Sequence, residues 1–391
     1  MRILLYSNHA PLNDHLFGGA HQLVHDLLRG MTARGVEVDL LCARTERTDL
    51  LDVGPRLRIA AELEGGGERD PRPEEVHRNL RRVALHVRRC DVVVTVDRPF
   101  PLQCLRPVIL LLYNFSYRDS VQSVFAFTWD SVIVPSDYLA TAVASVAGPA
   151  FWRGGERPIV TLRPGIDVDH FRASPDAAGA LRARLGLDGW SRCLWFPHRL
   201  DPRKGLEAAL RALAELRRKG DDYRLLVPAQ PETALQAAYL DRVRRMVRRH
   251  RLDDAVVLHR WVPYSDLPAY FSLADGCLAP STLPEGFGLT PLQAVSCGTP
   301  VVAAPAGAMP RLLPAGCGMT LVGADGVDHI VAAVRQPPDS AALARGRRVI
   351  AEQYALSRYL DEVVRHLEGA RRSNAVYDPD GSPSSRAALP R

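Results

Sequence analysis

The sequence lacks the long hydrophobic runs that mark membrane-spanning or exported chains. No stretch of its 391 residues approaches the roughly 20 apolar residues that a spanning helix needs. Met1 to Tyr6 is only a short apolar run before polar Ser7, unlike the long apolar core of a signal peptide. We therefore expect a cytoplasmic protein without a membrane anchor.

Cysteine pairs and metal-ligand spacings are also missing. The seven cysteines are odd in number, and none of them forms a C-x-x-C pair. Several lie in apolar runs, which is typical of reduced, buried thiols. No His and Cys spacing suggests a zinc site, and no acidic pair lies near the glycine motifs described below. The sequence therefore predicts no metal and no bound cofactor.

The net charge excludes few classes of binding partner, because it is only +6 and the pI is about 9.0. The strongest basic run, residues 241–251, has no interleaved aromatic residues, which argues against nucleic-acid binding. We interpret it as a solvated helix face. Association with a membrane surface is the less favoured alternative.

Residues 284–303 carry the most information. Glu285 is followed by Gly286 and Gly288, then by a helix and by a buried strand that begins near Thr299. Glycines before a helix let a ligand approach free backbone N–H groups that attract an anion. A carboxylate beside such a site could bind hydroxyl groups, so the segment suits a sugar nucleotide. The alternative is an ordinary loop-to-helix junction with a capping box.

In that capping box, Thr290 would be the N-cap, Pro291 the first helical residue and Gln293 the third.

Short apolar runs alternate with helical patterns along the chain, which predicts parallel sheets covered by helices on both faces. Predicted strands are Arg2–Tyr6, Glu37–Cys42, Val92–Val96, Val108–Leu112 and Val132–Val134, and, after a break at residues 161–176, Cys193–Phe196, Arg224–Val227, Ala255–Leu258, Gly276–Ala279 and Pro300–Ala303. Predicted helices are Ala20–Ala33, Leu206–Arg218, Leu235–His250 and Ser357–Arg371. This is an α/β chain with two similar domains that leave a cleft between the carboxyl ends of their sheets.

We place the domains at residues 1–172 and 173–356. A C-terminal helix at 357–371 would pack back across the domains, and residues 372–391, rich in Ser, Pro, Asp and Gly, would form a disordered tail.

Five motifs in order resemble those of the retaining GT-B glycosyltransferases of family 4. The matching segments are Gly18-Gly19-Ala20 after the first strand, Trp129 to Ser136, Pro164-Gly165-Ile166-Asp167 with Phe171, Arg199-Leu-Asp-Pro-Arg-Lys204-Gly205, and Leu273 to Pro300 with Pro280-Ser281 and Glu285-Gly-Phe-Gly. The resemblance covers the chain to about Arg371. It implies two Rossmann-like domains, the N-terminal one on the acceptor side, and parallel sheets that face each other across an interdomain cleft.

The resemblance also implies residue roles. Arg199 and Lys204 would stabilise the leaving diphosphate in place of a metal ion, and Glu285 would bind hydroxyl groups of the donor sugar. Transfer would proceed with retention of configuration, without an enzymic nucleophile. The donor would further contact Gly18, Gly19, Phe287, Gly288, Leu289, Thr290 and Gln293.

Three positions depart from the family pattern. Gln293 stands where the family has a second glutamate, His198 stands where glycine is common, and Tyr113 or Asn114 stands where a strand usually runs into histidine. The resemblance implies that the second glutamate binds both ribose hydroxyls of the donor. Because a single amide suits one such hydroxyl better than two, Gln293 suggests that a dTDP-sugar is accepted, or at least that dTDP and UDP donors are discriminated weakly.

The predicted function is therefore transfer of a hexose or pentose from a nucleotide-diphosphate sugar, the only co-substrate, to a hydroxyl of an acceptor. We favour a small soluble acceptor such as an antibiotic aglycone, with a dTDP- or UDP-sugar donor. The alternatives are polysaccharide or phosphoinositol-lipid assembly, an epimerase or phosphorylase on the same fold, and a non-catalytic partner subunit of another glycosyltransferase.

Overall fold

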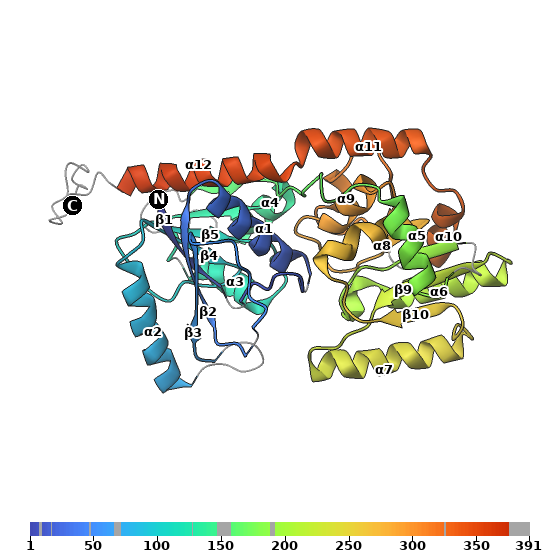
Figure 1. Ribbon diagram of the computed structural model, residues 1–391, viewed down its shortest axis with the longest axis horizontal. Coiled ribbons are helices and arrows are strands. Elements are labelled where there is room, and N and C mark those ends of the chain that lie inside the picture. Colours follow the sequence, from blue (N-terminus) through green and yellow to red (C-terminus); the bar gives the residue numbers. More distant parts are fainter. Residues whose placement is uncertain are drawn as a thin grey trace.

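Two parallel sheets organise the chain in the computed structural model (Figure 1). The structure describes residues 1–7, 10–16, 18–46, 48–65, 72–126, 128–146, 158–187, 192–323 and 326–374. The first sheet has the order β3 (Leu57–Leu63), β2 (Glu37–Ala43), β1 (Arg2–Tyr6), β4 (Val92–Val96), β5 (Val108–Leu111), β6 (Ser131–Val134) and β7 (Ile159–Thr161). The second has the order β10 (Val256–His259), β9 (Tyr223–Pro228), β8 (Arg192–Trp195), β11 (Gly276–Ala279), β12 (Val301–Ala303) and β13 (Met319–Leu321). The predicted α/β architecture is confirmed.

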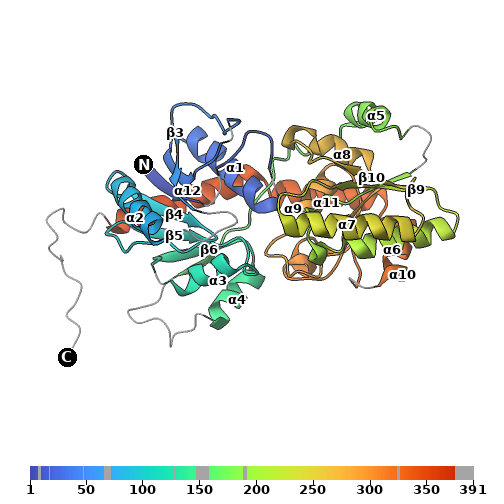
Figure 2. The ribbon, with the colours of Figure 1, turned by 90° about the horizontal axis from the view of Figure 1, so that it is seen from below.

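Helices connect the strands, so each sheet forms a separate lobe, and the lobes lie side by side in both views (Figures 1 and 2). The helices of the first lobe are α1 (Gly19–Ala33), α2 (Pro73–Val87), α3 (Arg118–Phe125) and α4 (Asp137–Val146). Those that follow are α5 (Pro175–Arg184), α6 (Leu206–Arg218), α7 (Ala234–Arg249), α8 (Leu267–Leu273), α9 (Leu289–Ser296), α10 (Val327–Arg335), α11 (Ser340–Gln353) and α12 (Leu356–Asn374). Short 3₁₀ turns are η2 (Pro202–Lys204), η3 (Tyr264–Asp266) and η4 (Met309–Arg311).

The chain crosses between the lobes at two adjacent segments. Ile166 donates its N–H to the carbonyl of Tyr354 over 2.8 Å, and its own carbonyl accepts the N–H of Leu356 over 2.9 Å. Gly165 packs directly on the backbone of Ala355, where a side chain would not fit. The crossing then leads into α12, which packs against α1 and β4 of the first lobe.

The structure corrects one detail of the sequence analysis and agrees with another. Helix α12 extends to Asn374, so it includes the first three residues of the predicted disordered tail, while residues 375–391 lie outside the described residues. The cysteines match the prediction of unpaired, mostly buried thiols: all seven are free, and only Cys104 is partly exposed.

Candidate active site

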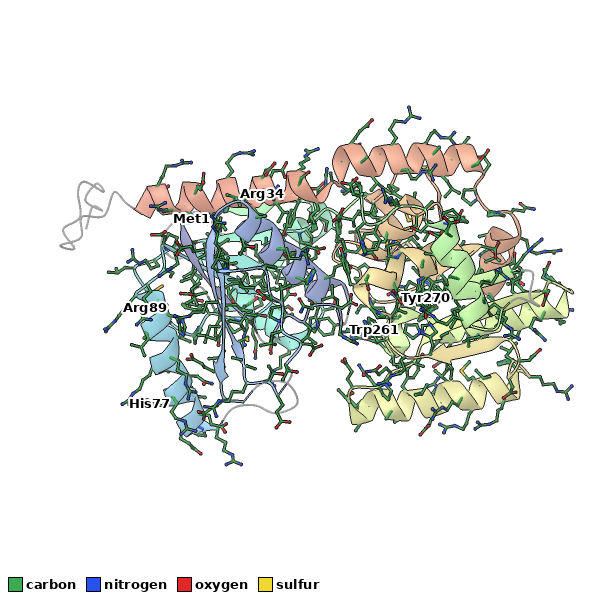
Figure 3. All side chains as sticks on the ribbon, viewed as in Figure 1. Met1, Arg34, His77, Arg89, Trp261 and Tyr270 are labelled. Atoms are coloured by element: carbon green, nitrogen blue, oxygen red, sulfur yellow. The ribbon has the colours of Figure 1, made fainter. Side chains whose placement is uncertain are left out.

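The predicted site residues lie at the carboxyl ends of strands, where both lobes turn toward each other. Ser136 follows β6 in the first lobe, Arg199 follows β8 in the second, and Glu285 lies in the loop after β11. Hydrogen bonds join these loops across the boundary: the Ser136 hydroxyl donates to the carbonyl of Gly286 over 2.6 Å, and the Trp261 indole donates to the carbonyl of Leu16 over 2.9 Å. Trp261 lies where the lobes meet (Figure 3).

Lys204 and Glu285 form the ion pair at the centre of the site. Lys204 Nζ donates to Glu285 Oε1 over 2.6 Å, and the two side chains are only 14% and 18% exposed. Gly205 makes this approach possible, because its φ of 85° is left-handed and a Cβ there would collide with the carbonyl oxygen of Pro280. The structure thus brings together two residues that the sequence analysis assigned to one site.

Arg199 lies in a second cluster with three residues that the sequence analysis did not predict. Asp201 accepts two hydrogen bonds from the Arg203 guanidinium, at 2.8 and 3.0 Å, and also pairs with Arg199 at 3.5 Å. Burial alone would raise the pKa of Asp201, but the bonds from Arg203 hold it at about 2. Since one carboxylate serves two guanidinium groups, a positive charge remains for an anion.

Tyr117 covers this cluster from the first lobe. Its ring lies 5.2 Å from the Arg199 guanidinium and 5.6 Å from that of Arg203. Such cation–π contacts stabilise the two guanidinium groups and partly shield them from water. Local sequence could not reveal the contact, because 82 or more residues separate the partners.

Two helix N-termini meet beside these cations. Gly18 (φ 95°) is the N-cap of α1 and Gly288 (φ 126°) that of α9, and neither cap has a side-chain hydrogen bond. Gly19 and Leu289 are the first residues of the two helices, and a Cβ added at Gly19 would lie 3.4 Å from Leu289 Cδ1, so the two residues are neighbours. Free N–H groups and both helix dipoles therefore favour an anion here, and neither first turn has an acidic residue to compete.

The predicted capping box at Thr290 is wrong. Helix α9 begins at Leu289, so Thr290 and Pro291 are its second and third residues and Gly288 is the N-cap. The reason is that the positive φ of Gly288 lets the backbone turn into the helix two residues earlier than a cap at Thr290 would. Gln293 lies one turn further on, is buried, and donates from Nε2 to Gln22 Oε1 of α1 over 2.7 Å.

The loop after β11 touches the first lobe directly. A Cβ added at Gly286 would overlap the carbonyl oxygen of Tyr113. Tyr113 itself is buried, and its hydroxyl lies 3.0 Å from that of Tyr359 on α12. Of the two acceptor-side candidates, Asn114 therefore remains the one with a partly exposed side chain.

Asn114 is held by a buried carboxyl group at the end of β4. Asp97 has a φ of 50°, rare for a non-glycine residue, and accepts bonds from the backbone N–H groups of Tyr113 and Asn114 and from Asn114 Nδ2. Burial raises the pKa of Asp97 to about 7. The side-chain oxygen of Asn114, Oδ1, in turn accepts a hydrogen bond from the Ser120 hydroxyl over 3.1 Å. This network fixes the Asn114 rotamer on the acceptor side.

A small apolar pocket lies next to the cations, at the ends of β8, β9 and β10. Its lining residues are Leu16, Trp195, Pro197, Pro228, Trp261, Val262, Tyr264 and Leu267. Leu16 comes from the first lobe and the others from the second, so the pocket is at the lobe boundary. The pocket has a volume of only about 30 Å³, so an aromatic ring would lie against its apolar walls and not inside it.

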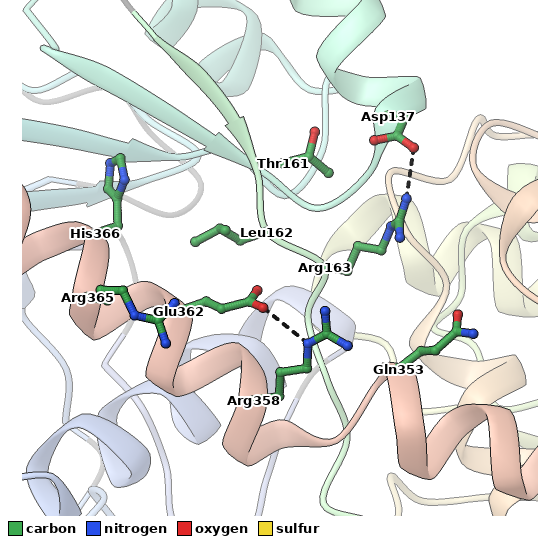
Figure 4. A pocket seen from close by; sticks show the side chains of 9 residues that line it. All are labelled: Asp137, Thr161, Leu162, Arg163, Gln353, Arg358, Glu362, Arg365 and His366. Carbon is green, nitrogen blue, oxygen red and sulfur yellow. Dashed lines mark hydrogen bonds and ion pairs between the residues drawn. The ribbon is translucent and has the colours of Figure 1, made fainter.

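A second cavity lies away from this site, beside the two chain crossings (Figure 4). It has a volume of about 660 Å³ and mixed charge: Arg163 pairs with Asp137 at 2.9 Å, and Arg358 with Glu362 at 3.1 Å. Because its cations are largely paired and exposed, we assign it no ligand.

Two partly buried histidines predict a loss of stability in acid. Burial lowers the pKa of His198 to about 3 and that of His259, stacked on Trp195, to about 4. An unfolded histidine has a pKa near 6.5, so the unfolded state takes up protons first, and stability is lost as the pH falls from about 6.5 to 4. We expect a cost of about 1 to 2 kcal/mol for each histidine.

Thermal unfolding midpoints at pH 7.0 and 4.5 measure this loss. The decrease in the unfolding midpoint between pH 7.0 and 4.5 should be smaller in His259→Phe, which keeps the stacking on Trp195, than in the native protein. The exposed control His77→Gln should show the same decrease as the native protein. Asp97, whose raised pKa acts in the opposite direction, is common to all three proteins. Equal drops in all three would contradict the prediction.

The described residues contain neither a candidate metal site nor a candidate membrane-spanning helix. No group of three His, Cys, Asp or Glu side chains there could hold a metal ion, and no described helix has the length and apolarity that crossing a bilayer requires. Activity without a metal ion stays a prediction.

Known proteins resemble this chain in sequence and in structure. Residues 179–337 match the family described as glycosyl transferases group 1. A GDP-mannose-dependent α-(1-6)-phosphatidylinositol monomannoside mannosyltransferase of Mycolicibacterium smegmatis is 34% identical over 215 residues, which is 52% of each chain. A D-inositol 3-phosphate glycosyltransferase of Mycobacterium bovis is 34% identical over 209 residues, 52% of this chain and 41% of that one. The chain thus spans about half the length of the curated relatives it matches.

Solved structures share the fold along nearly the whole chain. Sucrose-phosphate synthase from Thermosynechococcus elongatus superimposes with a TM-score of 0.75 at 20% identity, over 95% of this chain and 100% of that one. The HepE protein of Anabaena, in complex with UDP and glucose, superimposes with a TM-score of 0.73 at 18% identity, over 94% and 100%. At these identities the likeness concerns the two-lobed fold.

Proposed function

We propose that this chain is an enzyme that moves a sugar from a nucleotide-diphosphate donor to a hydroxyl group of an acceptor, because its residues 179–337 match the family of glycosyl transferases group 1. The observation that carries the proposal is the partly buried Lys204–Glu285 pair, together with Arg199 and the neighbouring N-termini of α1 and α9. A non-catalytic subunit would have no need to retain this set.

The geometry supports separate binding groups for the base, the diphosphate and the sugar of the donor. The base would lie against the apolar pocket, and the N–H groups in the first turns of α1 and α9 would bind the diphosphate, while the N–H of Gly18 itself bonds to the carbonyl of Leu16. Lys204 would turn from Glu285 to the leaving phosphate, where its charge opposes the negative charge that develops. Glu285 would then accept hydroxyl groups of the sugar.

Retention of configuration fits the same arrangement. Reaction at the anomeric carbon passes through an oxocarbenium-like state, and a diphosphate held by Lys204 and Arg199 can accept the proton of the incoming hydroxyl on its own face of the sugar. Closure of the loop at Gly286 onto Tyr113 would exclude water and so limit hydrolysis of the donor.

The comparisons favour an inositol-bearing acceptor over an aglycone. Both relatives described above carry inositol in the names of their substrates, and one uses GDP-mannose. We therefore propose a phosphoinositol or a related phosphorylated polyol as the acceptor. This corresponds to the alternative that the sequence analysis ranked second, and the dTDP-sugar hypothesis stays a prediction.

Product analysis tests the proposal. GDP-mannose, UDP-glucose, UDP-N-acetylglucosamine and dTDP-glucose are each incubated with inositol phosphate, phosphatidylinositol or no acceptor, in excess EDTA, and products are read by mass spectrometry. We expect one acceptor-dependent glycoside, formed despite EDTA. Its absence for every pair would contradict the assignment, products without acceptor would favour an epimerase, and rescue by magnesium would contradict metal independence.

A further inference from the structure

An arginine without an ion-pair partner among the described residues lies on the acceptor side of the site. Arg98 follows β4 at the carboxyl edge of the first sheet. It is next to Asp97 in sequence, and Asp97 holds the Asn114 side chain at 3.0 Å. The backbone of Arg98 is fixed as well, because its carbonyl accepts the Thr95 hydroxyl over 2.8 Å. Arg98 and Asn114 therefore belong to the same edge of the sheet, which the first lobe turns toward the second.

The guanidinium of Arg98 is held by an aromatic ring and not by a carboxylate. It lies 4.6 Å from the centre of the Tyr6 ring, and Phe100 supports that ring edge-on at 5.5 Å. The Arg98 Nε is buried and has no hydrogen-bond partner among the described residues. A guanidinium carries five N–H donors, and a donor that is buried without a partner costs free energy. The contact with Tyr6 holds the group in place but does not satisfy its donors.

Neither neighbouring carboxylate pairs with Arg98. Asp119, in the first turn of α3, is near enough for its charge to act on the Tyr6 hydroxyl, whose pKa is raised by burial, lowered by Arg98 and raised by Asp119. No oxygen of Asp119 comes within the 4.0 Å of an ion pair with Arg98, however. The oxygens of Asp97 already accept the three hydrogen bonds described above. Because the Arg98 side chain is also partly exposed, an anion that enters from the cleft meets a cation that is not neutralised.

We propose that Arg98 binds the phosphate group of the acceptor and thereby selects a phosphorylated polyol over the same polyol without phosphate. The inference rests on the proposed function, in which the first lobe receives the acceptor. A phosphate offers several acceptor oxygens to a guanidinium, and such charge-assisted bonds are stronger than bonds between neutral groups. A free polyol phosphate and a phosphoinositol lipid both carry this group.

Kinetics of the full chain test this inference, with the donor that product analysis identifies and with inositol phosphate, a short-chain phosphatidylinositol and inositol as acceptors. For the native protein, kcat/KM for the better phosphorylated acceptor should exceed that for inositol at least about tenfold. Which of the two is better distinguishes the free from the lipid-bound source. Arg98→Gln should reduce this ratio below about threefold and leave the donor KM and donor hydrolysis unchanged within about twofold. Arg98→Lys should give an intermediate ratio, because lysine keeps the charge but not the planar fork.

Arg106→Gln is the matched control, since Arg106 is an exposed arginine at the opposite edge of the same sheet, just before β5. It should keep the native ratio. A purely structural role of Arg98 would slow transfer to all three acceptors equally and leave the ratio unchanged in Arg98→Gln, which would overturn the inference. A native ratio below about tenfold would overturn it as well.

Calorimetric binding of inositol phosphate and of short-chain phosphatidylinositol separates this inference from the proposed function. Binding to the native chain that Arg98→Gln weakens at least about tenfold, without sugar transfer from any donor, would support the phosphate site and contradict the proposed function. Transfer to another acceptor, with no binding of either phosphorylated polyol, would overturn the inference and leave glycosyl transfer standing.

Discussion

Lys204→Ala is expected to slow sugar transfer about a hundredfold while the protein stays folded. Loss of one charge-assisted contact to a leaving group costs about 3 kcal/mol of transition-state stabilisation, or roughly two orders of magnitude in rate. Arg199→Ala should have a similar effect. Because the contact strengthens as the diphosphate leaves, kcat should fall more than donor affinity.

A second lysine provides a matched control for Lys204→Ala. Lys219 is the only other lysine of the chain, and it pairs at the surface with Glu215 at 3.4 Å. Lys219→Ala should leave kcat within twofold of the native value, since exposed ion pairs contribute little. Turnover is measured with the donor and acceptor identified by product analysis, and unfolding midpoints show whether each variant is folded. Near-native kcat for Lys204→Ala and Arg199→Ala would contradict their assignment to the diphosphate.

Elements with strong periodicity or fully apolar runs were predictable from the sequence. Helix α6 has the bounds expected for it, Leu206–Arg218, because its apolar positions recur on one face and Gly220 follows its end. Strand β3 and helix α2 were not predicted. Strand β3 lies at the sheet edge and is only partly buried, and α2 has few buried apolar positions, so neither gives a clear apolar pattern.

Only part of the candidate site could be predicted from the sequence. Arg199, Lys204 and Glu285 could be predicted because family motifs carry them. Tyr117 and Gln22 belong to no such motif, and they contact the second lobe only because α1 and the N-terminus of α3 lie at the lobe boundary. Contacts of this kind depend on the relative position of two domains, which local propensity does not encode.

Gly286→Ala is expected to abolish most of the activity, more than a hundredfold, with little change in the stability of either lobe. Gly286 has an ordinary backbone conformation, so alanine adds no local strain, but its methyl group would overlap the carbonyl oxygen of Tyr113 across the lobe boundary. The loop would have to retreat, which would break the Ser136–Gly286 bond and move Glu285 away from the anomeric carbon.

Gly323→Ala is the matched control, since a Cβ there meets no atom within 4 Å. Steady-state kinetics and unfolding midpoints of Gly286→Ala, Gly323→Ala and Ser136→Ala separate the possible causes. If closure of the loop onto the first lobe completes the site, Gly286→Ala loses activity, Ser136→Ala loses less because only one hydrogen bond is removed, and Gly323→Ala keeps it. Hydrolysis of the donor without acceptor should rise relative to transfer in Gly286→Ala, because an open loop admits water. Native transfer rates in Gly286→Ala would mean that the contact with Tyr113 plays no part in catalysis.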